Sequence, residues 1–238
     1  FHAPAGPILG FEALLRWQHP KQGLLTPELF LPLAEKTGLI IPIGNWVINE
    51  ACRQLREWHL QGHQSWSMAV NLSTLQFEQP SLVKTVLGCL ARHNVPPEML
   101  ILEVTETTAM SNPEESVRVL TELTDAGVKA SIDDFGTGYS SLLYLKRLPA
   151  CELKIDRAFV KELSGESDDA TIVSAIVALA KTLNLKVVAE GVETEEQQTF
   201  LTELGCNTLQ GYLLGKPVSA LDIEALCEHG EMLPDAEP

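Results

Sequence analysis

The feature that most constrains the fold is a regular alternation of apolar, β-branched runs with amphipathic stretches. The stretches between the runs have helical periodicity, and those at residues 27–38, 45–62 and 111–127 close on a glycine. Strands that alternate with helices predict a mainly parallel sheet. The predicted strands cover residues 8–17, 67–73, 100–106, 128–134, 151–156, 186–192 and, more weakly, 206–212.

Each predicted strand carries a polar residue at or near its carboxyl end. An open, doubly wound sheet concentrates its ligand groups at one switch point. A closed barrel instead collects one contribution from nearly every strand at a shared mouth. The sequence therefore favours an α/β fold of the TIM-like (β/α)8 barrel type. The strand-end residues are, in chain order, Glu12, Asn71, Glu103, Asp133, Lys154, Glu190 and Gln210.

Seven predicted strands leave such a barrel one strand short. The first residues, "FHAPAGPILGF", resemble the second half of a hairpin. We therefore expect the first strand to be incomplete or missing in this chain. No repeat or linker interrupts the sequence, which predicts a single barrel domain over residues 1–232 and a loose tail over residues 233–238.

Composition narrows the classes of partner. A formal net charge of −15 over 238 residues would repel a nucleic-acid backbone, so we expect no DNA or RNA binding through a broad basic face. No apolar run approaches the roughly 18 residues that cross a bilayer, so we expect no membrane segment. The five cysteines are scattered and never form CxxC. This pattern is typical of a reducing cytosol and predicts a cytoplasmic location.

The polar set at the strand ends suggests hard divalent cations. Magnesium and manganese prefer carboxylate, carbonyl and water oxygens, and no histidine or cysteine stands at a strand end to suggest zinc. Asp133 and Asp134 are adjacent and would repel each other. Two metals about 3.5–4 Å apart that share one carboxylate would remove this repulsion. Gly136 and Gly138 then let the chain turn sharply and approach a ligand closely.

Each motif alone also has an ordinary structural interpretation. Two aspartates before a glycine-rich turn are often a helix cap, and Lys154 alone could form a surface ion pair. The case for a site rests on the recurrence of such residues at the same structural level. His59 and His63 have a spacing that could bind a metal, but a solvated helix face is favoured. Packing roles are predicted for the cysteines and for Trp17, Trp46, Trp58 and Trp66.

The ordered motifs "EALLRW", "NLS", "EVTE", "DDFGTGYSS", "LKID", "AEGVE" and "QGY" closely resemble the EAL domain family. This family contains bacterial phosphodiesterases that act on cyclic di-GMP. The resemblance covers about residues 8–220. It implies a TIM-like barrel with an antiparallel first strand, and hydrolysis of cyclic di-GMP to linear pGpG with two Mg²⁺ or Mn²⁺ ions per active site.

The resemblance also implies roles for individual residues. The first metal would be held by Glu12, Asn71, Glu103 and Asp133, with Asp133 bridging to a second metal near Asp134 and Glu190. Lys154 would orient or activate the attacking water, and Glu190 is an alternative general base. The remaining implied roles belong to Gln210 (a water, the second metal's surroundings or substrate), Arg16 (a substrate phosphate), Glu106 (an anchor for the loop that contains Gly136 and Gly138) and Glu193 (a supporting partner).

Two other functions stay open at this point. A catalytically silent EAL domain would bind cyclic di-GMP and signal through a partner. A barrel of the enolase superfamily also uses acids and a lysine at strand ends. The resemblance further implies a homodimer that pairs near the loop after Asp134, and a sensory or GGDEF domain upstream in the full-length protein.

Overall fold

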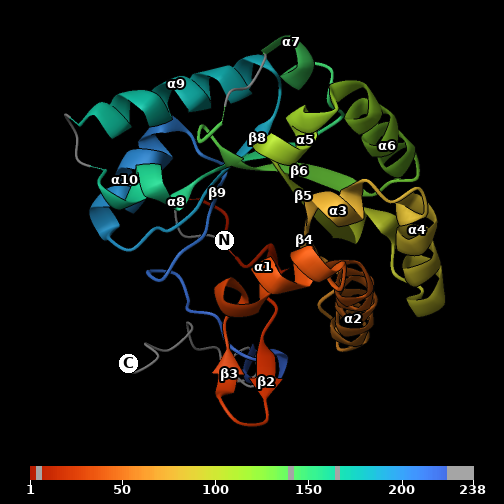
Figure 1. Cartoon of the computed structure of the whole chain (residues 1–238). Helices are drawn as coiled ribbons and strands as arrows, with labels where there is room; N and C mark the ends of the chain where they lie inside the picture. Colours follow the sequence, from red (N-terminus) through yellow and green to blue (C-terminus); the bar gives the residue numbers. More distant parts are fainter. Residues whose placement is uncertain (4–6, 139–141, 164–166, 224–238) are drawn as a thin grey trace. The chain divides into compact units, whose positions relative to one another are not determined.

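The structure is a computed structural model that describes residues 1–3, 7–138, 142–163 and 167–223. The chain forms two compact units that interleave along the sequence (Figure 1). Unit 2 contains residues 10–104 and 108–130, and unit 1 contains residues 1–9, 105–107 and 131–238. The single domain over residues 1–232 stays a prediction, and the tail at 233–238 lies outside the described residues.

Unit 2 is built on three parallel strands in the order β1 (Gly10–Ala13), β4 (Ser67–Leu72) and β5 (Leu100–Thr105). Side chains alternate along each strand, so Val70, Leu72 and Leu102 are buried on one face. The opposite face carries polar residues, and the register places Asn71 directly beside Glu103. The sequence therefore produces a sheet with one apolar and one partly polar face.

The helices of unit 2 bury their apolar stripes beside this sheet. α2 and α4 lie side by side, and α2 also contacts β4 (Figure 1). α2 buries Ile48, Cys52 and Leu55, whose spacing of three to four residues places them on one helix face. The elements are α1 (Pro27–Thr37), α2 (Ile40–Leu60), α3 (Thr74–Phe77), α4 (Leu82–His93), η1 (Pro97–Met99) and α6 (Pro113–Asp125), while α5 (Glu106–Ser111) starts in unit 1.

A short antiparallel pair in unit 2 was absent from the sequence prediction. β2 (Trp17–His19) pairs with β3 (Gly23–Leu25), whereas the sequence predicted one strand over residues 8–17. Both strands are three residues long and largely exposed, so they lack the apolar alternation by which a strand is recognised.

Unit 1 contains four parallel strands in the order β6 (Lys129–Phe135), β7 (Glu152–Ile155), β8 (Lys186–Ala189) and β9 (Thr208–Leu209). Side-chain caps fix the starts of its longer helices. Ser167 Oγ accepts a hydrogen bond from the Ala170 N–H, and Thr194 forms a capping box with Gln197. The helices are α7 (Leu142–Leu145), α8 (Arg157–Lys161), α9 (Asp168–Thr182) and α10 (Glu195–Leu204).

A short antiparallel segment lies beside β9. The Leu209 N–H donates to the Phe1 carbonyl, and the Phe1 amino group donates to the Leu209 carbonyl, both over 3.0 Å. The Ala3 N–H donates to Asn207 O over 3.1 Å, and His2 forms an antiparallel bridge with Thr208. Residues 1–3 therefore occupy the place of the antiparallel strand that was expected to be incomplete or missing.

Two packing predictions are wrong. His59 is buried rather than solvated, because it continues the apolar stripe of α2 four residues after Leu55. Trp46 is 57% exposed, which contradicts its predicted packing role, whereas Trp17 is 45% exposed but packs its ring against His19 and Phe30. The other two tryptophans, Trp58 and Trp66, are buried as predicted, and so are Cys52, Cys89 and Cys206. No helix in the described part of the chain is long and apolar enough to span a bilayer.

Candidate active site

Unit 2 brings three of the predicted residues to one face of its sheet. Asn71 and Glu103 are register partners on β4 and β5. Glu12 on β1 pairs with Ala69, two residues before Asn71, and therefore faces the same side. The Asn71 side-chain amide donates to Glu12 Oε1 over 2.6 Å, which leaves the Asn71 carbonyl oxygen as the atom that can bind a cation.

Glu103 and Arg16 complete the polar residues of this group. Glu103 is only 2% exposed, which is unusual for a carboxylate and indicates a specific role. Arg16 follows β1, and its Nη1 donates to the carbonyl oxygen of Leu15 over 2.8 Å. No salt bridge to Arg16 occurs among the described residues, so its guanidinium has donors available for an anion.

Unit 1 presents Asp133 and Asp134 on a β-bulge. Ile132 pairs with Leu153 and Phe135 pairs with Ile155, so two aspartates on β6 oppose the single residue Lys154 on β7. Asp134 adopts a left-handed backbone conformation with φ of 52°. A bulge interrupts the two-residue alternation of side chains. Both carboxylates can therefore face the same side of the sheet, which regular alternation would not allow for adjacent residues.

Lys154 is the cation that lies closest to these carboxylates in unit 1. Its Nζ is 2.6 Å from Glu190 Oε1 and 3.5 Å from Asp133 Oδ1. The Lys154 side chain is 2% exposed, and the side chains of Asp133 and Glu190 are 10% and 18% exposed. A buried ammonium that lies between two carboxylates is fixed in position by these ion pairs.

The carboxyl group of Asp134 has a perturbed acidity. Partial burial, the neighbouring carboxylates of Asp133 and Asp156, and a hydrogen bond with Asp156 raise the pKa of Asp134 to about 6, against an opposing effect of Lys154. Asp156 was not predicted as a site residue, although it stands in the quoted motif "LKID" two residues after Lys154. Its Oδ1 also accepts from the Ala158 N–H over 2.7 Å and caps α8.

The loop after the bulge is tied to Glu106. This glutamate is 2% exposed, and its Oε2 accepts a hydrogen bond from the Gly136 N–H over 2.8 Å. Gly136 has a φ of 99°, which favours glycine, and a Cβ on Gly138 would lie 3.0 Å from Glu106 Oε1. This is the contact that the family resemblance implies for Glu106. Residues 139–141, the end of "DDFGTGYSS", lie outside the described residues.

The three remaining predicted residues follow β8 and β9. The Glu190 N–H donates to Ile155 O over 3.2 Å, and the Gln210 N–H donates to Ala189 O over 2.9 Å. These backbone bonds extend the parallel pairing and fix Glu190 and Gln210 at the carboxyl ends of the strands. Glu193 is different, because its side chain is exposed and its backbone N–H donates to Gln197 Oε1.

The donor chemistry of both groups suits a hard divalent cation. Carboxylate and amide oxygens are the preferred ligands of Mg²⁺ and Mn²⁺. Burial, followed by the neighbouring carboxylates of Asp133 and Asp156, raises the pKa of Asp134, and a bound metal would favour its charged form. Within the described residues, no three His, Cys, Asp or Glu side chains are already arranged around a common metal position. The cation between Asp133 and Glu190 is instead the ammonium of Lys154.

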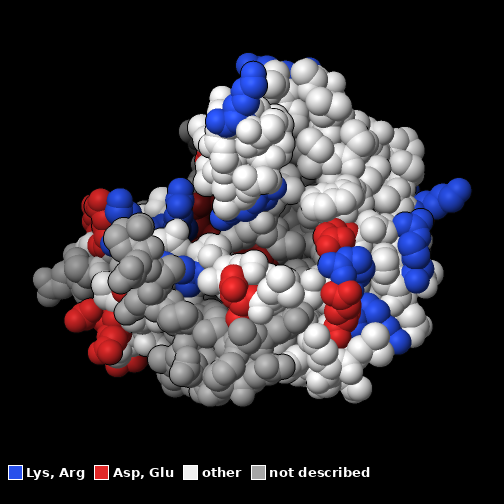
Figure 2. Space-filling model, turned by 90° about the horizontal axis from the view of Figure 1, so that it is seen from below, with Lys and Arg blue, Asp and Glu red and all other residues white. Residues whose placement is uncertain are grey.

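Charge is dispersed over the described part of the face drawn in Figure 2. On the face drawn in Figure 2, lysine and arginine side chains form small groups among acidic ones, and much of the surface carries neither. That face presents no continuous basic band of the kind that follows a nucleic-acid backbone.

Comparison with known proteins agrees with the resemblance that the sequence motifs show. The EAL domain family model matches residues 1–217. The chain is 66% identical to the bifunctional diguanylate cyclase/cyclic di-GMP phosphodiesterase MucR of Pseudomonas aeruginosa, covering 92% of this chain and 32% of that protein. It is 46% identical to the cyclic di-GMP phosphodiesterase NbdA of the same organism, and this match covers 92% of this chain and 28% of NbdA. The chain thus spans about a third of the length of these curated relatives.

Solved structures extend the likeness to three dimensions. A structure of the PaMucR phosphodiesterase in a c-di-GMP complex is 64% identical, with a TM-score of 0.91 over 93% of this chain and 90% of that one. The predicted TIM-like α/β fold is confirmed by this likeness, because EAL domains have that fold. The family-model match over residues 1–217 and the 66% identity to MucR show that the chain belongs to the EAL domain family.

Proposed function

We propose that this EAL domain hydrolyses cyclic di-GMP to linear pGpG with two Mg²⁺ or Mn²⁺ ions. The observation that carries the proposal is the bulge at Asp133 and Asp134 opposite Lys154. It supplies two adjacent carboxylates and a buried ammonium at one strand end, which a purely structural role would not require. The names of relatives such as MucR and NbdA support the same substrate.

The metal ligands would come from both groups of residues. EAL phosphodiesterases in general depend on metal. When bound, the ions would make water more acidic and stabilise charge on the phosphodiester oxygens. The proposed assignment is the one that the resemblance implies: Glu12, Asn71, Glu103 and Asp133 for the first ion, with Asp133 bridging to the second ion near Asp134 and Glu190.

The protein's own side chains would handle the proton and the substrate. Lys154 is held by Glu190 over 2.6 Å, so its ammonium can donate a hydrogen bond to the attacking water and fix its orientation. Glu190 is the carboxylate nearest to Lys154 and the candidate for accepting the proton of that water. Arg16 would bind a phosphate oxygen of the substrate, and Gln210 would hold a water or the substrate.

The glycine loop would position one wall of the site. The loop is held by the hydrogen bond from the Gly136 N–H to Glu106, a partly buried charge-assisted bond of the stronger kind. Gly138 lies close to the same carboxylate, so a larger residue at this position would collide with Glu106. Glu193 would contribute less, since its side chain is exposed.

A direct assay tests the proposal. The purified chain is incubated with cyclic di-GMP and either Mg²⁺ or Mn²⁺, and pGpG is followed by chromatography. Product should form only with metal and should be lost in Glu12→Gln but retained in Glu203→Gln, which changes an exposed acid of α10 in the same way. A folded chain that binds cyclic di-GMP without hydrolysis under either metal would overturn the proposal. It would leave the domain as a silent receptor that signals through a partner.

Dimerisation and an upstream domain are further parts of the proposal. Leu142 and Leu143 of α7, directly after the loop, are 58% and 68% exposed, which supports a contact between two copies at this position. The much greater length of the relatives supports a sensory or GGDEF domain in a longer protein. Sedimentation should give a dimer at micromolar concentration, and a monomer there would contradict the first of these two points.

A further inference from the structure

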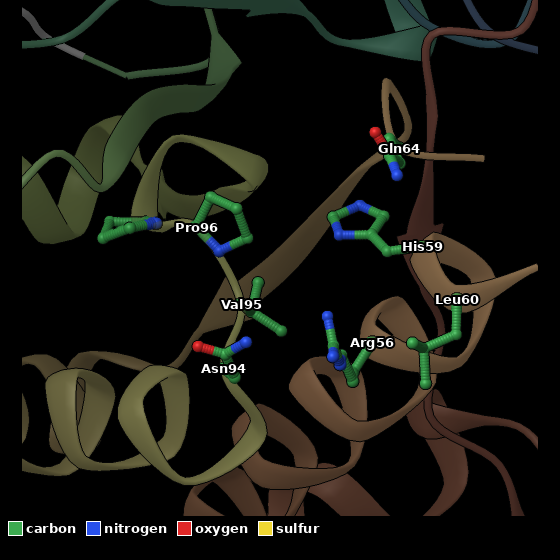
Figure 3. A pocket seen from close by; sticks show the side chains of 8 residues that line it. Arg56, His59, Leu60, Gln64, Asn94, Val95 and Pro96 are labelled. Atoms are coloured by element: carbon green, nitrogen blue, oxygen red, sulfur yellow. The ribbon is translucent and has the colours of Figure 1, made fainter. Parts of the chain in front are cut away.

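A hollow of about 630 Å³ opens in unit 2, at the end of α2 (Figure 3). In Figure 3, Arg56 and His59 project from α2 toward Asn94, Val95 and Pro96, which follow α4. The hollow is therefore formed by the carboxyl end of one helix and the connection between α4 and β5. Its lining consists of Arg56, His59, Leu60, Gln64, Asn94, Val95, Pro96 and Pro97.

This hollow is separate from the carboxylates that would bind metal in unit 2. Gln64 precedes β4, and Asn94 to Pro97 precede β5. Asn71 and Glu103 stand near the carboxyl ends of those two strands. The strand from Ser67 to Asn71 alone spans about 13 Å. A ligand in the hollow would thus contact none of the residues assigned to hydrolysis.

The charge in the hollow is opposite to that of the whole chain. The net charge of the protein is −15, yet no acidic residue lines the hollow. Arg56 has no salt-bridge partner among the described residues. Arg53, one turn earlier on α2, is by contrast paired with both Glu50 and Glu57. The guanidinium in the hollow therefore has donors available for an anion.

The walls of the hollow are half apolar and half polar, and two of their residues, His59 and Val95, are buried and held in place. The ring of His59 is held because its Nε2 donates to Trp66 O over 2.9 Å. Val95 is buried, its N–H donates to Leu90 O over 3.1 Å, and Pro96 and Pro97 restrict the backbone that follows. The volume of this open hollow lies in the range of sites that bind small organic molecules, and its lining offers both apolar contacts and polar groups.

The carbonyl groups at the end of α2 do not oppose an anion strongly. The carbonyl oxygens of Glu57 and Trp58 accept hydrogen bonds from the N–H groups of Gln61 and His63. Their partial negative charge is thereby compensated within the backbone. Arg56 has a simpler possible role here, because a cation near a helix carboxyl end stabilises the helix without any ligand. The experiment must separate these two roles.

We propose that the hollow binds a small organic anion. Its carboxylate or phosphate would accept hydrogen bonds from Arg56, and its flat apolar part would lie against Leu60, Val95 and Pro96. The side-chain amides of Gln64 and Asn94 would bond to polar atoms at the rim. Occupation of this site requires neither metal nor hydrolysis of cyclic di-GMP.

Binding is tested with simple probes on the ¹⁵N-labelled chain, followed by chemical shifts of backbone and indole N–H groups. Benzoate and phenyl phosphate carry the two candidate anionic groups, and benzamide is the neutral match for benzoate. Saturable shifts should appear around Val95 and Trp66 with at least one anion and should be much smaller with benzamide. The anion that binds more tightly identifies the preferred group.

A matched pair of variants assigns the effect to Arg56. Arg56→Gln should weaken anion binding by about tenfold or more, the value of a charged hydrogen-bond pair. Arg53→Gln, with the same charge change on the same helix, should bind as the natural chain does. Unshifted spectra with both anions, equal shifts with benzamide, or equal affinity in Arg56→Gln would each overturn the proposal and leave Arg56 as a helix-stabilising cation. Well-dispersed spectra of both variants establish that each is folded.

Discussion

The two groups of strand-end acids control their negative charge in different ways. In unit 2, Glu12 and Glu103 stand on regular strands, and the neutral amide of Asn71 donates to Glu12. In unit 1, Asp133 and Asp134 are adjacent on a bulge and face the buried ammonium of Lys154. In unit 2, the spacing of the side chains along regular strands is sufficient to keep the carboxylates apart. In unit 1, the adjacent carboxylates require an irregular backbone and the nearby ammonium of Lys154.

This difference indicates in which unit a substitution should affect the site most. A substitution in unit 2 removes one predicted metal ligand from a regular strand. A substitution in unit 1 disturbs a set of charges that depend on one another. Coupled charges respond to the loss of one member by changes in the pKa values of the rest. Substitutions at the coupled charges of unit 1 should therefore lower activity more than substitutions at residues outside this set.

Lys154→Met should have the largest effect. Without the ammonium, the attacking water loses its orienting donor, and hydrolysis should fall by about 10³-fold. Stability should also fall, because Asp133 and Glu190 would be left without their nearest positive charge. The control is Lys186→Met at the exposed start of the neighbouring β8. Initial rates of pGpG formation measure the effect, and a loss below tenfold would remove Lys154 from the proposed chemistry.

Glu106→Gln should lower the hydrolysis rate by about tenfold, the value of one charged hydrogen bond. The glutamine can still accept from the Gly136 N–H, but it cannot do so as a carboxylate. The loop should therefore be less well held while the fold is kept. Rates are compared with those of Glu203→Gln, and equal rates in the two variants would show that the tie to Gly136 does not limit catalysis.

Asp134→Asn should separate stability from activity. The pKa of Asp134 is raised to about 6 from its ordinary 3.8, so the folded chain binds this proton more tightly than the unfolded chain does. Stability without metal should therefore decrease as the pH rises from about 4 through about 6. The asparagine cannot ionise and should lack this decrease.

With EDTA at pH 7, the Asp134→Asn variant should melt about 2–4 °C higher than the natural chain, and the difference should vanish at pH 4. The effect is modest because Asp134 is only partly buried, so solvent screens its charge. Asparagine also tolerates the left-handed backbone at this position. Hydrolysis should nevertheless be lost. A lower melting temperature at pH 7 would contradict the proposed repulsion among Asp133, Asp134 and Asp156.

Glu193→Ala should have the smallest effect. Its side chain is exposed, and its backbone N–H, which bonds to Gln197, is kept in the variant. The free energy of unfolding should change by no more than about 0.5 kcal/mol, and the rate by less than about threefold. Initial rates of pGpG formation and thermal melting curves of the variant measure these two changes. A tenfold loss of rate would give Glu193 the supporting role that the family resemblance implies.

Much of the site could be predicted because strand ends have a clear pattern. Apolar runs with a polar residue at or near their carboxyl ends indicated Asn71 and Glu103, which lie on β4 and β5, and Glu190, which directly follows β8. The adjacent acids also predicted a break in alternation at Asp133, and β6 has a bulge there. The positive φ of Asp134 was not predictable, because it depends on pairing with a strand twenty residues away. Asp156 was overlooked beside the more conspicuous Lys154.

The errors in the fold have physical reasons as well. His59 was taken for a solvated residue because its type and its spacing to His63 were considered alone. The burial of Ile48, Cys52 and Leu55 at helical spacing would have placed it inward. The hairpin of β2 and β3 was missed because exposed three-residue strands have no apolar period. Its form depends on pairing within unit 2 rather than on local composition.

The central claim is that the bulged pair Asp133 and Asp134 holds a metal that the regular strands cannot hold alone. The most direct measurement is the number of Mn²⁺ ions bound per chain, from electron paramagnetic resonance of free Mn²⁺ during a titration. Two ions should bind to the natural chain and to Glu203→Gln, and one ion should bind to Asp134→Asn. No bound Mn²⁺ in the natural chain, or an unchanged number in Asp134→Asn, would contradict this claim.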